Sequence, residues 1–364
     1  MTGQPYISVI VSAYNRRRYL PFALRSLEAQ TLPRDKFEVI VVKNFEDKES
    51  DDIISRNSWK NIYNDDPYYG RMIFAGLEES KGDVITVLDD DDLYTGNRLE
   101  KVYKAFTSYE RLTYFHNSQT IIDDNGNALK RPPLSKNLVG ESPALIDVNK
   151  LDIFAKKHGM SVIDVILKIR AGADINSSSL AVRRSALEVN AHLLRELPAG
   201  FDVFAFVSSV KAGGLMYFTD EKLTLYRVHG ENWSRPAKGE GKGAYLKLAR
   251  TLLVAINAYR LISSRLLNDD INEYLCFERL HKGELQLLPL PELGTLPPEL
   301  RLSLSDVKLT LRCYKVKEVY GSLTQVAFVM GRVLFGPLLA SPKGRSIIGR
   351  LAEGIHKRLR RQES

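Results

Sequence analysis

The sequence is poor in cysteine and has none of the common glycine-rich phosphate motifs. Its two cysteines, Cys276 and Cys313, do not form a paired ligand motif, which argues against a zinc site and favours a reduced, cytoplasmic setting. No G-x-G-x-x-G or P-loop pattern occurs, so a bound diphosphate would have to be held mainly by a metal ion. The first residues do not read as a signal segment, because a strand is expected from Tyr6.

Composition and charge leave several kinds of partner open. Hydrophobic residues make up 44% and charged residues 26% of the 364 residues, which is ordinary for a globular protein of more than one domain. The net charge is +8, with the basic excess concentrated near the C-terminus. This distribution argues against a nucleic-acid partner and fits an anionic membrane surface or phosphate-bearing substrates.

An acidic run after a short apolar segment is the strongest local signal. Val84 to Leu88 predicts a buried strand, and the carboxylates of Asp89 to Asp92 follow it directly. Four adjacent negative charges repel one another unless a cation lies among them. Dense oxygen ligands suit Mg²⁺ or Mn²⁺, and the carboxyl end of a central strand is where open α/β sheets bind ligands. The alternative is a solvated acidic turn.

The order of elements around this run predicts a parallel sheet. Strands are expected over Tyr6–Ala13 and Phe37–Val42, with a helix to about Gln30 between them and another near 69–80 before the acidic strand. Pro21 fits the first turn of the first helix. Arg16, Arg17 and Arg18 precede that helix and could meet a phosphate, although a solvated helix start is the alternative.

Shorter elements are expected after the acidic run. Helices are predicted over 97–108, 183–194 and 202–212, and strands over 112–123, 175–182, 216–219 and 223–228. A hairpin turn is expected over 124–127. Residues 131–173 form an apparent insertion with a helical period over Leu151–Ile169, which we interpret as an acceptor region.

Several segments together resemble a known family. They are Ser12-Ala13-Tyr14-Asn15, Leu27-Glu28-Ala29-Gln30, Lys81-Gly82-Asp83 before the acidic run, and Leu223 to Ser234 with its Tyr-Arg-Val-His core. Over roughly residues 5 to 235 the chain resembles the family 2 glycosyltransferases of the GT-A fold. The resemblance implies an α/β fold with a Rossmann-like, mostly parallel sheet flanked by helices. We therefore expect a catalytic domain over 1–243. The region 244–364, which the resemblance does not cover, is expected to be helical from its own residue pattern.

The resemblance implies roles for the residues around the acidic run. Asp89 and Asp91 match the Asp-x-Asp motif, so Asp89 is expected near the nucleotide ribose and Asp91 on Mn²⁺ or Mg²⁺. Asp92 and His229 are expected to assist at the metal. Asn44 stands where the family commonly has an acidic pair that contacts the base. The full nucleotide-sugar set implied is Tyr14, Asn15, Asn44, Asp89, Asp90 and Arg227.

The resemblance also implies a general base. Inverting members use a carboxylate near the start of the helix before the last strands, and Asp202 occupies that position here. Such a base takes the proton of the acceptor hydroxyl. Alternatively Asp202 merely N-caps a helix that begins at Val203, with Glu196 as the replacement base. Asn232 and Trp233 are expected on a loop that closes over the donor.

The favoured function is that of an inverting, metal-dependent glycosyltransferase in glycan or glycolipid assembly. It would move a sugar, a hexose in the favoured interpretation, from a nucleotide-diphosphate donor to a hydroxyl or lipid-phosphate acceptor. A nucleotidyltransferase of similar fold is a second interpretation, although the glycine-rich loop of such enzymes is absent. A catalytically inactive, membrane-associated scaffold is the third.

The C-terminal region predicts contact with a membrane. A helical period covers Leu246–Leu267, prolines follow at 289–298, and Leu323–Leu339 is apolar apart from Thr324, Gln325 and Arg332. A basic tail follows this apolar segment, which favours peripheral binding on the cytoplasmic face of a membrane over spanning. A helix packed on the catalytic domain is the alternative.

Overall fold

The computed structural model describes residues 6–137, 142–230, 232, 242–267, 273–287 and 300. The chain separates into two compact units, Met1–His229 and Gly230–Ser364. Each unit is described by itself below.

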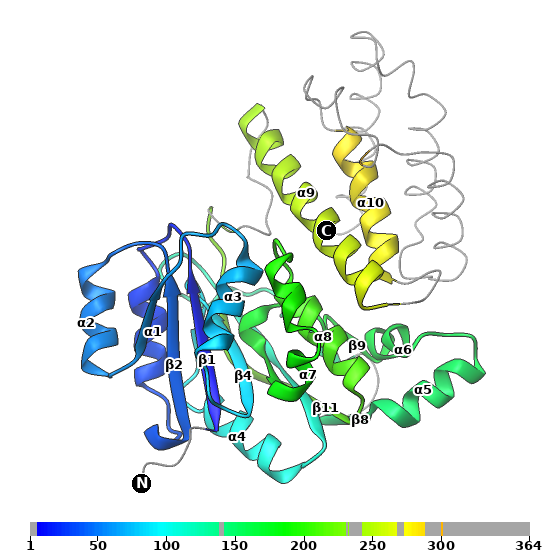
Figure 1. Cartoon of the computed structure of the whole chain (residues 1–364), viewed down its shortest axis with the longest axis horizontal. Helices are drawn as coiled ribbons and strands as arrows, with labels where there is room; N and C mark the ends of the chain where they lie inside the picture. Colours follow the sequence, from blue (N-terminus) through cyan, green and yellow to red (C-terminus); the bar gives the residue numbers. More distant parts are fainter. Residues whose placement is uncertain are drawn as a thin grey trace. The chain divides into compact units, whose positions relative to one another are not determined.

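The first unit is built on one mixed sheet of nine strands in the described residues (Figure 1). The strand order is β3-β2-β1-β4-β10-β6-β11-β5, and β8 pairs with β11. The bounds are β1 Ile7–Ala13, β2 Phe37–Lys43, β3 Lys60–Tyr63, β4 Val84–Asp89, β5 Leu93–Tyr94, β6 Leu112–Ile122, β8 Ala144–Asp147, β10 Leu180–Arg183 and β11 Leu215–Arg227. A second small sheet pairs β7 (Lys136–Asn137) with β9 (Arg170–Ala171).

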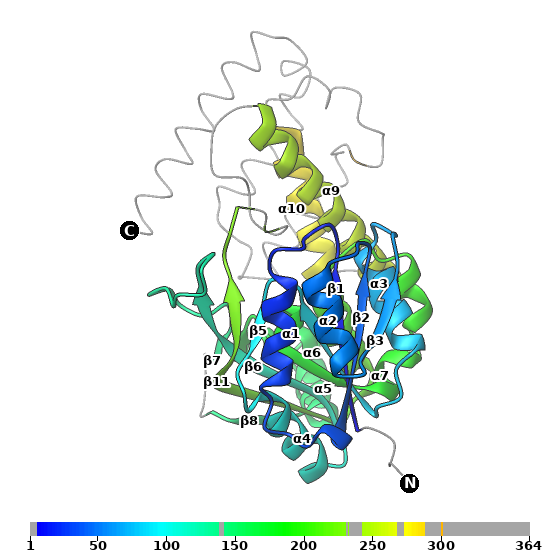
Figure 2. The ribbon, with the colours of Figure 1, turned by 90° about the vertical axis from the view of Figure 1, so that its left-hand side faces the viewer.

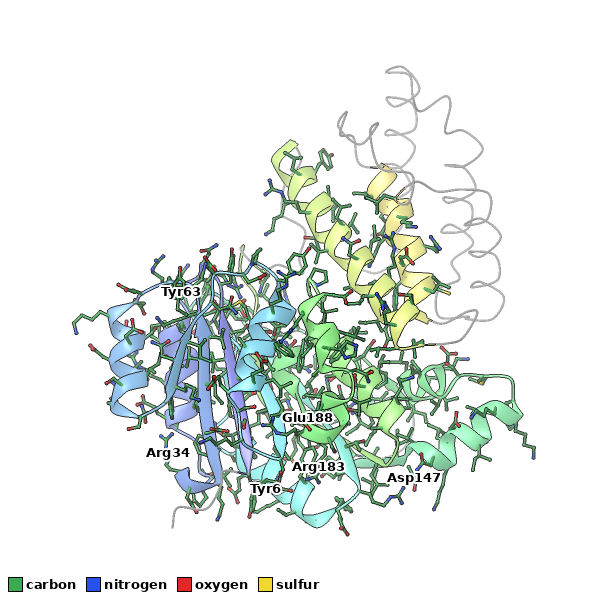
Figure 3. The ribbon with its side chains drawn as sticks, viewed as in Figure 1. Tyr6, Arg34, Tyr63, Asp147, Arg183 and Glu188 are labelled. Atoms are coloured by element: carbon green, nitrogen blue, oxygen red, sulfur yellow. The ribbon has the colours of Figure 1, made fainter. Side chains whose placement is uncertain are left out.

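The parallel part of the sheet follows directly from its sequence. β1, β2 and β4 are almost entirely buried, as expected for apolar runs covered on both faces. β3, β2, β1 and β4 are mutually parallel, so their carboxyl ends share one edge. Figure 3 marks the two edges, with Tyr6 before the start of β1 and Tyr63 at the end of β3. The predicted β-α-β-α-β order is confirmed, with one helix and one strand added.

Helices cover both faces of this sheet (Figure 2). One face of β1, carrying Ile7, Val9 and Val11, packs in a common core with α1, α2 and α4. On the other face α3 approaches so closely that a Cβ on Gly76 would lie 2.5 Å from Ile10. The helices of the first unit are α1 Leu20–Glu28, α2 Lys48–Arg56, α3 Tyr69–Glu78, α4 Arg98–Ser108, α5 Val148–Lys157, α6 Val162–Ile169, α7 Arg184–Glu188 and α8 Phe201–Ala212.

Several sequence-based boundaries are wrong. The helical period over 151–169 belongs to two helices, α5 and α6, because Gly159 adopts φ +65° and Ser161 caps a new helix. The strand expected over 175–182 is mostly a short 3₁₀ turn over Ser177–Ser179, with β10 after it.

Other predicted helix and strand boundaries differ from the structure, because polar segments and β-bulges obscure the sequence pattern of regular structure. The helix expected over 183–194 ends at Glu188 in α7, and a 3₁₀ turn follows. The two strands expected over 216–228 are the single strand β11, whose register shifts near Thr219 and Lys222 hid its continuity. The polar stretch after β2 contains α2 and β3, which the sequence interpretation missed.

The second unit contains a helix pair in its described part. α9 (Lys242–Arg265) confirms the predicted helical period, and α10 (Glu273–Leu287) packs against it. No helix among the described residues is long and apolar enough to cross a membrane. The apolar segment 323–339 and the basic tail lie outside those residues. Cys276 in α10 is disulfide-bonded, so the expectation of two reduced cysteines is wrong for this residue.

Candidate active site

The acidic run lies at the carboxyl edge of the sheet and is buried. Asp89 ends β4 opposite Ser12 of β1, and the Asp90 amide donates to the Ser12 carbonyl at 3.2 Å. Asp90, Asp91 and Asp92 are 0%, 7% and 1% exposed. A solvated acidic turn is therefore excluded, and the negative charges must be balanced from within the fold.

Arg16 supplies much of that balance. Its guanidinium binds both carboxylate oxygens of Asp90 and donates to Asp91 Oδ2 at 2.5 Å. Asp90 is fully enclosed in this contact, so its carboxylate holds Arg16 rather than facing a pocket. Of the three arginines before α1, Arg16 is thus the one that belongs to the site. Arg17 packs over the Phe45 ring and Arg18 pairs with Asp124.

His229, which follows β11, contacts the same carboxylate oxygen of Asp91 as Arg16 does. Its Nε2 lies 2.9 Å from Asp91 Oδ2. Burial by itself raises the pKa of Asp91, but the hydrogen bond from His229 and the charge of Arg16 outweigh it and lower that pKa. Asp91 is therefore an ionised carboxylate, and a cation can compete with Arg16 and His229 for it.

Asp92 faces the interior. One of its oxygens accepts the Arg227 backbone amide at 3.0 Å, and the other accepts the Asn176 side-chain amide at 3.1 Å. The Arg227 guanidinium donates to the carbonyls of Asp91, Asp123 and Asp124. Asp92 and Arg227 thus fasten the end of β11 to the acidic run.

The carboxylate of Asp89 accepts a hydrogen bond from a tyrosine. The Tyr69 hydroxyl donates to Asp89 Oδ1 at 2.5 Å. Burial, with repulsion from Asp91, raises the pKa of Asp89 to about 7. Tyr69 opens α3, whose next residue must be glycine, because a Cβ on Gly70 would lie 2.3 Å from the Leu194 carbonyl oxygen.

The residues predicted for the nucleotide pocket meet at the ends of β1 and β2. The Asn15 amide donates to Asn44 Oδ1 at 2.8 Å, and Asn44 Nδ2 donates to Asn15 Oδ1 at 2.9 Å. Asn15 has φ +58°, a conformation that asparagine tolerates better than most residues. Tyr14, beside it, is half-buried.

Asp202 lies at the start of α8, close enough to Asp89 for its negative charge to contribute to the raised pKa of that carboxyl. Its Oδ2 accepts the Asn176 backbone amide at 2.8 Å, and its Oδ1 accepts the Val203 amide at 3.0 Å. The helix begins at Phe201 with Gly200 as its N-cap, so Asp202 is not the cap. Burial raises the pKa of Asp202, and this effect outweighs the two hydrogen bonds, which lower it. A raised pKa makes this carboxylate a stronger base than an exposed one.

The sequence also singled out Glu196, Asn232 and Trp233. Glu196, the replacement base, is exposed at the end of a 3₁₀ turn. Asn232 is buried, and Trp233 lies outside the described residues. The sequence interpretation missed Tyr69 and Asn176 and left Arg16 open. Of these, only Arg16 had a signal, as a basic residue at the end of the first strand.

The possible metal ligands at the acidic run are too few to surround a metal ion by themselves. Among the described residues no group of three or more His, Cys, Asp or Glu side chains is arranged to hold a metal ion. Mg²⁺ is usually bound by one or two carboxylates together with substrate phosphates. Asp91 with His229 fits such a site, whereas Asp92 already uses both oxygens.

Comparisons with known proteins agree with this architecture. The sequence profile of Glycosyl transferase family 2 matches residues 8–161. An uncharacterised glycosyltransferase of Nostoc sp. is 27% identical over 62% of this chain and 66% of its own length. An undecaprenyl-phosphate 4-deoxy-4-formamido-L-arabinose transferase of Pseudomonas syringae is 33% identical over 24% of this chain and 28% of its own length. The chain thus matches less than two thirds of either relative.

A solved structure shares the fold. TarS 1–349 of S. aureus, crystallised with UDP-GlcNAc, superposes with a TM-score of 0.50 at 13% identity, covering 90% of this chain and 91% of that 1–349 chain. The central sheet with its flanking helices is thus that of the GT-A glycosyltransferases. Residues 8–161 of the first unit thus match family 2 of the glycosyltransferases, and the Nostoc relative is likewise named a glycosyltransferase.

Proposed function

We propose that the chain is an inverting, metal-dependent glycosyltransferase. It transfers a sugar from a nucleotide-diphosphate sugar to a hydroxyl or lipid-phosphate acceptor. The catalytic domain spans 1–243, and the region 244–364 binds the cytoplasmic face of a membrane peripherally. The observation that carries the proposal is the link of Asp202 to the acidic run through Asn176, with 2.8 Å and 3.1 Å hydrogen bonds.

Asp202 acts as the general base. It takes the proton of the acceptor hydroxyl while that oxygen attacks the anomeric carbon and the bond to the diphosphate breaks. The attack comes from the face opposite the leaving group, so the anomeric configuration inverts. General-base catalysis contributes roughly 10²–10⁴ in rate. Burial suits Asp202 to this role, because it raises the pKa of the carboxyl.

The donor is bound at the parallel edge of the sheet. Asn15 and Asn44 lie at the ends of β1 and β2, where a nucleotide base can reach them. Asp89, oriented by Tyr69, is available for the ribose. The donor set also includes Tyr14, Asp90 and Arg227. Asp90 contributes by fixing Arg16, and Arg227 by fixing the acidic run.

Asp91 and His229 would hold Mn²⁺ or Mg²⁺, while Asp92, whose oxygens accept from Arg227 and Asn176, would help by fixing the acidic run. The metal supplies stabilisation of the negative charge that develops on the departing nucleoside diphosphate. Arg16 shares Asp91 with His229 and so provides positive charge at the same place.

The acceptor is proposed to bind near the insertion 131–173. Its helix α5 exposes Ile153 and Phe154, which are 71% and 51% accessible, among exposed lysines. The Pseudomonas relative is named for an undecaprenyl-phosphate acceptor, which motivates lipid phosphates as acceptors to test. TarS was crystallised with UDP-GlcNAc, which makes that donor the first candidate.

The test is an assay of a nucleotide-sugar panel with and without Mn²⁺. Metal-dependent release of nucleoside diphosphate supports the proposal. Release of pyrophosphate from nucleotide triphosphate and sugar phosphate would instead identify a nucleotidyltransferase. Absence of turnover and of nucleotide binding across the panel would contradict both and favour a scaffold.

A further inference from the structure

Asn176 has an unusual backbone conformation at the point where the two sides of the site meet. Its φ of +75° lies in the left-handed region, which non-glycine residues seldom adopt. The residue follows the insertion and precedes the 3₁₀ turn Ser177–Ser179. Such backbone conformations are strained and persist only where the surroundings enforce them.

The contacts of Asn176 divide between its backbone and its side chain. The backbone amide donates to Asp202 Oδ2 at 2.8 Å. The side-chain amide donates to Asp92 Oδ2 at 3.1 Å, and Asn176 Oδ1 accepts the Ser179 hydroxyl at 2.5 Å. One residue therefore touches both the proposed base and the acidic run.

The segment around Asn176 is fixed from the sheet. The Tyr114 hydroxyl donates to the Ala173 carbonyl at 2.7 Å, and His116 Nε2 lies 2.9 Å from the Ile175 carbonyl. On the other side, the Asp89 amide donates to the Ser178 hydroxyl at 3.1 Å. These anchors hold the segments on either side of Asn176, and the positive φ of Asn176 then directs its amide to Asp202.

We propose that Asn176 is a positioning residue for glycosyl transfer: its left-handed backbone directs one amide to Asp202, while its side chain fixes Asp92. This inference rests on the proposed function, in which Asp202 is the base. The backbone contact orients the carboxylate and favours its charged form, and the side-chain contact keeps the acidic run in register. The other ionisable groups facing Asp202 are Tyr69, Asp89 and Tyr114.

Two substitutions separate these contacts. Asn176→Gly keeps the left-handed backbone and the amide but removes the side chain. We expect kcat to fall less than about tenfold, with the acidic limb of its pH profile unchanged. Asn176→Ala disfavours positive φ and so turns the amide away from Asp202. We expect kcat to fall about 10²-fold and the acidic limb to move to higher pH, with donor KM changed less than about threefold for both variants.

A double-mutant cycle with Asp202→Asn distinguishes failure of this inference from failure of the proposed function. If Asn176 acts through Asp202, Asn176→Ala should add little to the loss caused by Asp202→Asn. A full additional loss, equal effects of glycine and alanine, or a shifted acidic limb in Asn176→Gly would overturn the inference. Because the glycine variant keeps the backbone, it remains decisive even if the alanine variant fails to fold. Normal turnover of Asp202→Asn would contradict the assignment of Asp202 as the base, and the role inferred for Asn176 would fail with it.

Discussion

The two halves of the sheet build the site in different ways. The parallel half, β3-β2-β1-β4, places its site residues at the ends of β1, β2 and β4, which are buried, apolar and in register. The mixed half, β10-β6-β11, contributes Asn176, Asp202 and His229 from a turn, a helix start and a strand end that are far apart in sequence. Donor-side residues thus follow from local sequence, whereas the proposed base and its partners depend on tertiary structure.

Electrostatics differ between the halves in the same sense. The parallel half concentrates negative charge in the acidic run and balances it with Arg16 from its own strand end. The mixed half holds single ionisable groups, such as His116 and Asp202, whose pKa values are shifted mainly by burial. Substitutions in the parallel half should therefore alter the charge balance of the acidic run. Substitutions in the mixed half should alter the proton affinity of single groups.

Asp91→Ala should have the largest effect, because it removes the carboxylate shared by Arg16 and His229. We expect metal-dependent transfer to fall by about 10³-fold or more, equivalent to about 4 kcal/mol. Circular dichroism should show a native fold, since the change removes one of several repelling charges. The exposed Asp65→Ala variant is the control. Activity near wild type in Asp91→Ala would contradict the metal assignment.

Arg16→Gln should mainly reduce stability. It leaves the fully buried Asp90 without its cationic partner, and breaking such a pair costs about 3 kcal/mol. Denaturant unfolding without metal measures the loss. Arg25→Gln, which breaks an exposed pair with Glu49, should cost less than about 1 kcal/mol. Equal losses would show that the acidic run does not depend on Arg16.

His116 should make stability fall with acid. Burial lowers its pKa from 6.5 to about 3, so between these values the unfolded chain binds the extra proton. Stability from this group is complete above pH 6.5 and falls as the pH drops towards the folded pKa. Between pH 7 and pH 5 the loss is about 2 kcal/mol. Unfolding of His116→Gln should lack this component, whereas the exposed His192→Gln should retain it. Identical pH slopes in all three proteins would refute the assignment.

Asn44→Ala should have the smallest effect. It removes both hydrogen bonds to Asn15 at the rim of the parallel half, where water can replace them in part. We expect nucleoside diphosphate to bind about five- to tenfold more weakly, or about 1 kcal/mol, by calorimetry. The exposed Asn61→Ala on β3 is the control. A larger change in turnover than in binding would move Asn44 from the donor to the chemical step.

The sequence predicted the parallel half well because apolar runs and a carboxylate cluster are local signals. β1, β2, β4 and the position of the acidic run at a strand end needed no long-range information, whereas β3 was missed because its segment is polar. The mixed half could not be read in the same way, since the bulges in β11 and the left-handed Asn176 have no local signature. The pairing of Asp92 and Asp202 through Asn176 joins segments 84 and 26 residues apart, which only the folded chain brings together.

The most direct test of the central claim is Asp202→Asn, with turnover and donor binding measured on the same preparation. The amide keeps the size of the carboxylate and one hydrogen-bond acceptor but cannot take a proton. We predict donor affinity near wild type and kcat lowered by roughly 10²–10⁴-fold, with Glu196→Gln close to wild type. Near-normal turnover in Asp202→Asn, or a large loss in Glu196→Gln, would contradict the assignment of Asp202 as the base.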